Sequence, residues 1–365
     1  MSFVHFARGV RTCVGRLGEH SPPDPESVVP LPILPLLHPR ELPGMREQIL
    51  VSAPSTIGSD LAMCLRRAMD DEEVPLPDLR NLQPPIMANS DESALRLDTT
   101  QARYDAYFGV RRTRDHDALA KGVLIAFHGV LDNLRSARSN LAPVQWHPLA
   151  AGIHSTLNFL LPADRRTCYR HSPLPRPHRA ADPAGRWQVG HRAFFVLTQC
   201  VIIGLRGFLD AAERAAWRDA VTALDYGTAM LAASEACLRF TADFHSDDYR
   251  RTVRPAMPPE FTGLASADHA CLITLLRAVG PTLGAMPAEF SEHREALRAT
   301  LHSVYLAHQG ICARFDGDRS PSLRMAPHSA VPATAVLSRL ARSRSRLLEP
   351  QITLSGQEAS RFAAE

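Results

Sequence analysis

The sequence predicts an all-α protein built as a single large helical domain. Several long segments carry apolar residues at the spacing of one helix face, as in amphipathic helices that pack on a core. Segments with the alternating pattern of a strand are few, and the chain shows neither regular strand–helix alternation nor a fixed-period repeat. With 365 residues the chain can bury a sizeable core.

The N-terminal part of the chain differs from the rest in its proline content. Prolines between Ser21 and Gly44 prevent a helix there, because proline lacks the amide donor and clashes with the preceding turn. We therefore expect three regions: a Pro-rich arm over residues 1–55 that packs on the domain, a helical domain over 56–348, and a C-terminal tail over 349–365.

Apolar periodicity predicts the positions of the helices. Asp210 followed by Glu213 resembles a capping box with Asp in place of Ser or Thr, which indicates that a new helix begins at Asp210. The segment between Pro162 and Trp187 is rich in Pro, Arg and His and has no stable period, so it should be a long loop. The predicted helices run from about 58 to 71, 115 to 140, 190 to 209, 210 to 245, 265 to 279, 291 to 315 and 332 to 348.

Charge and hydropathy argue against several classes of protein. The formal net charge is +3 and charged residues make up 22%, which does not indicate a dedicated nucleic-acid-binding protein. The longest apolar run, Ala193 to Leu205, is too short to span a bilayer, and the N-terminus lacks the apolar segment of a signal peptide. The 7 cysteines lack CxxC spacing, which indicates reduced thiols. We expect a soluble cytoplasmic protein without nucleic-acid or membrane partners.

The stretch from Tyr305 to Cys312 carries the most informative side chains. His308 and Cys312 are four residues apart on the apolar face of the predicted helix 291–315, so an imidazole and a thiol point to the interior together. His269 lies on the apolar face of the preceding predicted helix. Two antiparallel helices could therefore place a histidine on each side of a flat apolar ligand. Heme suits this geometry, because its iron takes imidazole as an axial ligand.

Spacing alone leaves other interpretations open. A buried histidine beside a small apolar cysteine is a common core pair, since free cysteine is among the most buried residue types. Zinc could take two nitrogens and two sulfurs from His269, Cys271, His308 and Cys312. That site is less attractive, because residues two apart on a helix face different ways.

Other catalytic motifs are absent from the sequence. It contains no Glu-x-x-His pair, no GxSxG motif, no Walker loop and no Rossmann fingerprint. It therefore gives no support to di-iron carboxylate chemistry, acyl transfer, P-loop chemistry or nicotinamide binding.

The order of His269, a long spacer and His308-Gln-Gly-Ile-Cys312 is similar to the HxnHxxxC heme motif of the bacterial heme-dependent tyrosine hydroxylases. Chain length and helical pattern resemble members that act on 3-methyl-L-tyrosine in saframycin-type antibiotic biosynthesis, and the resemblance covers most of the chain. It implies an all-α fold related to the tryptophan-dioxygenase superfamily. It also implies a c-type heme, held between helices through a single thioether, and hydrogen peroxide as co-substrate.

The resemblance also implies a role for each site residue. Cys312 would form the thioether to a heme vinyl group, His308 would be the axial ligand beside it, and His269 would be the histidine of the opposite helix. The implied reaction inserts oxygen ortho to the phenol of 3-methyl-L-tyrosine and gives 3-hydroxy-5-methyl-L-tyrosine. If both histidines bound iron at rest, no position would be open for peroxide. We therefore predict that one of them, His269 in preference, is a labile ligand or a distal acid/base residue.

Two further interpretations use the same residues. A heme protein with two histidine ligands could transfer electrons or act as a sensor without a substrate pocket. A helical interaction scaffold would keep His308 and Cys312 only as core side chains and would be colourless, and a zinc-stabilised helical protein would use them as metal ligands. The sequence does not identify the substrate-binding residues, and it leaves the tolerance for tyrosine itself and the oligomeric state open, a homodimer included.

Overall fold

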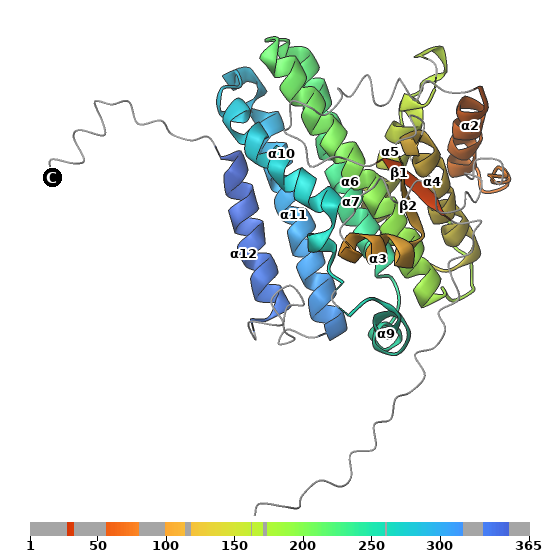
Figure 1. The fold of residues 1–365 in the computed structure, drawn as a ribbon. Helices are drawn as coiled ribbons and strands as arrows, with labels where there is room; N and C mark the ends of the chain where they lie inside the picture. The colour runs from red at the N-terminus through yellow and green to blue at the C-terminus, as the bar shows by residue number, and fades with distance from the viewer. Residues whose placement is uncertain are drawn as a thin grey trace, which may run out of the picture.

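The chain folds into a helical bundle with one short sheet, in a computed structural model (Figure 1). The prediction of an all-α class is therefore confirmed. Parts of the predicted arm over 1–55 and the tail beyond Glu349 lie outside the described residues. The structure describes residues 28–32, 56–79, 99–113, 118–161, 163–170, 174–259, 261–316 and 331–349.

The bundle is organised around two long helices, α6 (Pro183–Glu213) and α7 (Trp217–Thr241). They run antiparallel, because the start of α6 lies against the end of α7 and their middles meet at Gly204 and Gly227. A Cβ on Gly204 would lie 2.8 Å from the Cα of Gly227, so this close approach requires glycine. The two helices supply a large share of the buried apolar side chains.

The predicted helix boundary at Asp210 is wrong, because α6 continues through it. Its N-cap is Asp182, which accepts hydrogen bonds from the backbone amides of Ala184 and Gly185 and is followed by Pro183. Asp210 pairs with Arg206 one turn earlier, at 3.2 Å. The helix therefore begins inside the segment predicted as a loop and ends after the predicted break.

Further helices cover both sides of the central pair, as Figure 1 shows. Five of the predicted helices are present within a few residues of their predicted ends, whereas α3 and α5 were not predicted. Prolines at 143 and 148 interrupt the periodic pattern of α5, although the first lies at the tolerated N-terminal position. The helices are α2 (Thr56–Asp70), α3 (Thr99–Phe108), α4 (Ala118–Ser136) and α5 (Pro143–Phe159) on one side, and α10 (Ala267–Gly284), α11 (Ser291–Asp316) and α12 (Ala333–Ser345) on the other.

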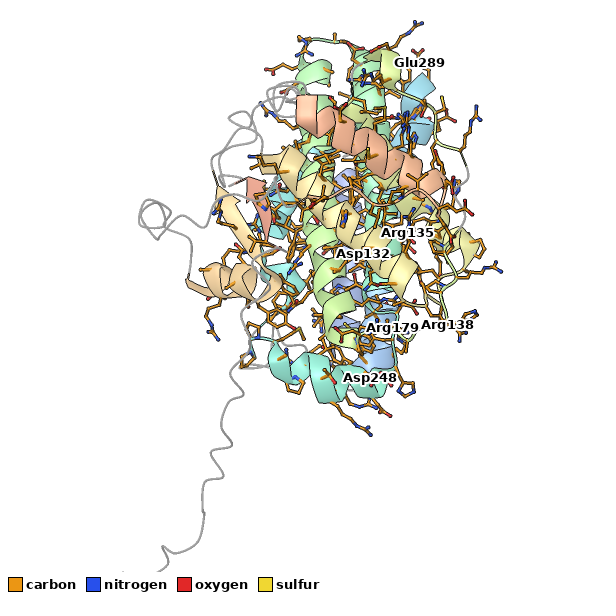
Figure 2. All side chains as sticks on the ribbon, turned by 90° about the vertical axis from the view of Figure 1, so that its right-hand side faces the viewer. Asp132, Arg135, Arg138, Arg179, Asp248 and Glu289 are labelled. Carbon is orange, nitrogen blue, oxygen red and sulfur yellow. The ribbon has the colours of Figure 1, made fainter. Side chains whose placement is uncertain are left out.

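Short elements complete the described chain. Strand β1 (Val29–Pro32) pairs in parallel with β2 (Val110–Thr113), so the described part of the predicted arm belongs to the core, with Val29 fully buried. Arg135 of α4, labelled in Figure 2, donates to the carbonyls of Val74 and Asp71 and so fixes the end of α2. The remaining elements are η5 (Ala163–Arg165), α8 (Ser246–Asp248), η6 (Tyr249–Val253), α9 (Arg254–Ala256), η7 (Gly263–Ala265), η8 (Ala288–Phe290) and η9 (Arg346–Leu348).

Helix α6 is long and apolar enough, by length and composition, to cross a membrane, which differs from the sequence prediction. The prediction considered only the run from Ala193 to Leu205, whereas the helix spans 31 residues. In the structure 78% of its most apolar window is buried inside the bundle. Because a core helix needs this composition as much as a membrane span does, burial accounts for the apolar character of α6.

Candidate active site

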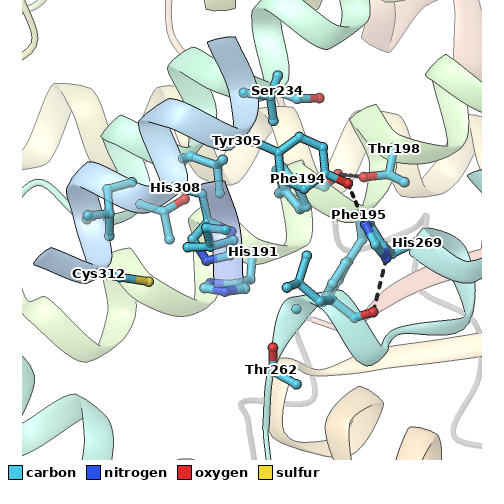
Figure 3. Close-up of a pocket in the computed structure, with 18 of the residues that line it drawn as sticks. His191, Phe194, Phe195, Thr198, Ser234, Thr262, His269, Tyr305, His308 and Cys312 are labelled. Carbon is cyan, nitrogen blue, oxygen red and sulfur yellow. Dashed lines mark hydrogen bonds between the residues drawn. The ribbon is translucent and has the colours of Figure 1, made fainter. Parts of the chain in front are cut away.

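A cavity between α6, α7, α10, α11 and α12 brings the predicted site residues together (Figure 3). His269, His308 and Cys312 all line it, and so does a third histidine, His191 of α6. Most of the remaining lining is aliphatic or aromatic. An apolar cavity with a few convergent polar groups is the usual form of a cofactor or small-molecule site.

His308 and Cys312 occupy one face of α11, as their spacing predicts, and both side chains are half-buried at the cavity wall. The ring of His308 has no hydrogen-bond partner among the described residues. Burial lowers the pKa of His308 to about 4, so the imidazole is neutral near pH 7. The thiol of Cys312 is not part of a disulfide. A neutral imidazole and a thiol therefore face the same apolar space.

His269 lies in the first turn of α10, where Ser266 is the N-cap and accepts from the amide of His269. Its Nδ1 lies 3.0 Å from the carbonyl oxygen of Leu264 and its Nε2 lies 3.2 Å from the hydroxyl of Tyr305. A carbonyl can only accept, so Nδ1 carries a proton, and in the neutral form of the ring Nε2 is the acceptor. His269 is thus present in the cavity with its ring orientation fixed by two hydrogen bonds.

His191 is the site residue that sequence reasoning missed. It is 9% exposed, its Nδ1 donates to the carbonyl of Trp187 at 2.8 Å, and its ring stacks on Phe108 at 4.4 Å. Burial and, to a smaller extent, the nearby His308 lower the pKa of His191 to about 4. A signal did exist, since Trp187, His191 and Phe195 are spaced four apart on one helix face. It was overlooked because the helix was expected to begin at residue 190.

The alternative of a four-residue zinc site is not supported by the structure. Cys271 is buried and does not line the cavity that holds His269, His308 and Cys312. Burial raises the pKa of the Cys271 thiol to about 11, which disfavours the thiolate that zinc requires. Among the residues that the structure describes, no three His, Cys, Asp or Glu side chains form a cluster that could hold a metal ion.

A buried cluster of polar side chains includes Asp268, the residue before His269. Arg112 of β2 donates to Asp105 of α3 at 3.0 Å and to Asp268 of α10 at 2.9 Å. Gln101 donates to Asp105, and Gln199 of α6 donates to Asp268. Burial is the largest influence on the Asp105 carboxyl and raises its pKa. Because Asp268 precedes His269 in the chain, this cluster anchors the turn of α10 that presents the histidine.

Comparison with known proteins identifies the family. A family model described as SfmD 3-methyl-L-tyrosine peroxygenase matches residues 35–293, more than half of the chain. The chain belongs to this peroxygenase family. The matched range includes His191 and His269 and ends before His308 and Cys312.

Individual relatives agree with the assignment to the SfmD family. The chain is 29% identical over 266 residues to a 3-methyl-L-tyrosine peroxygenase of Streptomyces lavendulae, an alignment that covers 69% of this chain and 72% of the relative. The crystal structure of reduced SfmD, obtained by soaking with sodium hydrosulfite, superposes with a TM-score of 0.59 at 24% sequence identity. That superposition covers 78% of this chain and 97% of the SfmD chain, so the two share a fold.

Proposed function

We propose that this protein is a heme-dependent peroxygenase that hydroxylates 3-methyl-L-tyrosine ortho to its phenol and gives 3-hydroxy-5-methyl-L-tyrosine. The observation that carries the proposal is the imidazole of His308, which faces an apolar cavity without a hydrogen-bond partner among the described residues. A neutral imidazole that faces a cavity in this way can bind a metal through the lone pair of its unprotonated ring nitrogen. Membership of the SfmD family supports both the chemistry and the substrate.

The residues of the cavity fit a heme. Its walls are mainly apolar, as the porphyrin requires, with a neutral imidazole at His308 and a second imidazole at His269. His308 and His269 would hold the iron, and Cys312, one helical turn from His308, would be the thiol that attaches the porphyrin by adding to a vinyl group. Bound heme would supply the iron at which hydrogen peroxide is activated for transfer of one oxygen.

The chain itself contributes an apolar enclosure and proton acceptors. Side chains such as Phe194 and Leu272 keep water from the reacting atoms. His191 and His269 each donate Nδ1 to a backbone carbonyl. Nε2 of the neutral His191 ring is therefore able to accept a proton or a hydrogen bond, and Nε2 of His269 could do so only when neither iron nor Tyr305 occupies it. Peroxide needs such an acceptor, because a proton must leave one of its oxygens and reach the other before the O–O bond breaks.

The first experiment is the absorption spectrum and intact mass of the purified protein. We expect a red protein whose mass includes one heme, and heme that stays with the chain in acidified organic solvent. The Cys312→Ala variant should release its heme under these conditions. Cys271→Ala, which removes a cysteine outside the cavity lining, is the matched control and should retain it. A colourless wild-type protein would reject the proposed function, and extractable heme would reject the thioether alone.

The second experiment is turnover with hydrogen peroxide and 3-methyl-L-tyrosine, with tyrosine in a parallel reaction. One oxygen should be added to the substrate, and label from H2(18)O2 should appear in the product. A heme-loaded protein that transfers electrons but adds no oxygen would favour the electron-transfer interpretation. We extend the proposal to a cytoplasmic role in antibiotic biosynthesis, with a tyrosine derivative as partner and neither nucleic acid nor membrane involved.

A further inference from the structure

The hydrogen bond between His269 and Tyr305 links the two helices that would hold the heme (Figure 3). Nδ1 of His269 donates to the carbonyl of Leu264, so in the neutral form of the ring, the form that can bind iron, the single lone pair is on Nε2. Tyr305 therefore donates its hydroxyl proton to that nitrogen, across 3.2 Å. In this conformation the nitrogen that would bind iron is already used as a hydrogen-bond acceptor.

Tyr305 is well placed to compete with iron for His269. It is on α11, three residues before His308, and its side chain lines the same cavity. It is only 6% exposed, so water has little access to its hydroxyl. Because one lone pair cannot serve two partners, a bond from His269 to iron and the hydrogen bond from Tyr305 exclude each other. Tyr305 and iron are thus alternative partners for Nε2 of His269.

We propose that Tyr305 is a positioning residue that receives His269 when this histidine leaves the iron and so opens a coordination position for peroxide. The inference rests on the proposed function, in which His308 would also hold the iron. Without the tyrosine hydroxyl, a detached His269 would leave Nε2 without a partner in an apolar cavity. The equilibrium would then shift toward the iron-bound histidine.

The test compares heme-loaded wild type with Tyr305→Phe, which keeps the ring and removes the hydroxyl. Cyanide is the probe, because it must find an open position on ferric iron. We expect the variant to bind cyanide about two- to tenfold more slowly, as the loss of one hydrogen bond predicts. Its ferric spectrum should contain more of the six-coordinate low-spin form. Tyr226→Phe, at a buried tyrosine of α7 outside the cavity lining, is the control and should match wild type.

A second background tests whether Tyr305 acts through His269. In His269→Ala the open position no longer depends on the histidine, so adding Tyr305→Phe should leave the cyanide rate unchanged. A persistent slowing in that background, or an unchanged rate and spectrum in the single variant, would overturn the inference while leaving the peroxygenase proposal intact. Absence of heme from wild type would overturn both. Tyr305→Leu, which also lacks the hydroxyl, replaces the phenylalanine variant if the latter does not fold.

Discussion

Two neighbouring regions of the interior differ in whether their polar side chains have hydrogen-bond partners within the protein. In the polar cluster, Arg112 is bonded to Asp105 and Asp268, and both carboxylates also accept from glutamine amides. In the histidine cavity, His308 has no hydrogen-bond partner among the described residues and shares its surroundings with apolar walls. The two regions meet at the first turn of α10, where Asp268 belongs to the polar cluster and the next residue, His269, lines the cavity.

The difference distinguishes polar side chains that stabilise the fold from polar side chains that can bind a ligand. A buried charge is tolerated when its partners lie inside the protein, and such a group is then fixed in position and unavailable for chemistry. An imidazole that faces a cavity without a partner inside the protein keeps a lone pair that can take a ligand. The predictions below test this distinction, from the largest expected effect to the smallest.

Loss of one side chain of the polar cluster should lower the free energy of unfolding far more than loss of one side chain of the cavity. Arg112→Met leaves two buried carboxylates without their cation, and we expect it to destabilise the protein by about 3–5 kcal/mol. Urea denaturation of the heme-free protein measures the change. The control replaces Asp105 and Asp268 by Leu in the same variant, which should recover much of the loss because no unpaired charge remains. A loss below about 1 kcal/mol for Arg112→Met would contradict the proposed role of the cluster.

The buried histidines should make the heme-free protein sensitive to acid. The pKa of His191 is about 4 in the folded protein and 6.5 for an ordinary imidazole. Between these values the unfolded state binds more protons, so stability is complete above about pH 6.5, falls as the pH is lowered toward 4 and is level below it. His191→Gln removes this contribution. We expect wild type to lose about 2–3 kcal/mol more than the variant between pH 7 and pH 4.5.

Urea denaturation at both pH values provides the comparison. The variant also serves as the control for carboxylates that titrate in the same range, since it retains all of them. Equal pH dependence of the two proteins would show that His191 is able to protonate in the folded state. The cavity would then be wetter than its lining indicates.

The closest helix contact beside the cavity should tolerate little added volume. A Cβ on Gly190 of α6 would lie 2.8 Å from the Cα of Thr241, and Thr241 lines the cavity. Gly190→Ala should therefore cost about 1–3 kcal/mol, because α6 and α7 must separate. Gly129→Ala on α4, where the nearest atom is 3.6 Å away, is the matched control and should be close to neutral or stabilising. Equal free energies of unfolding for the two variants would show that α6 and α7 can separate at Gly190 without loss of stability.

The sequence predicted the parts of the fold that depend on local pattern. Apolar periodicity located α10 and α11, and the four-residue spacing placed His308 and Cys312 on one wall. It failed for α6, because the side chain of Asp210 does not reveal whether it caps a helix or pairs with Arg206. A single charged residue is compatible both with a helix cap and with an ion pair inside a helix until its neighbours in the structure are known.

Long-range contacts in the candidate site were not predictable from spacing. Arg112 and Asp268 are 156 positions apart, and no local pattern pairs them. His191 was missed because its helix was expected to start at residue 190. The spacing from Trp187, which defines the helix face of His191, then fell outside the predicted helix. The hydroxyl of Tyr305 reaches His269 only because α10 and α11 lie on the same side of the central pair. The sequence thus supplied the reactive groups, and tertiary packing supplied their partners.

The smallest predicted effect isolates the hydrogen bond between Tyr305 and His269 in the heme-free protein. A double-mutant cycle with Tyr305→Phe and His269→Ala should give a coupling free energy of about 0.5–1.5 kcal/mol in urea denaturation. The same cycle with Tyr226→Phe in place of Tyr305→Phe should give none. A coupling near zero for Tyr305 would mean that the imidazole gains nothing from the hydroxyl. Nε2 of His269 would then gain a stabilising partner only from a bound ligand, while Nδ1 keeps its hydrogen bond to Leu264.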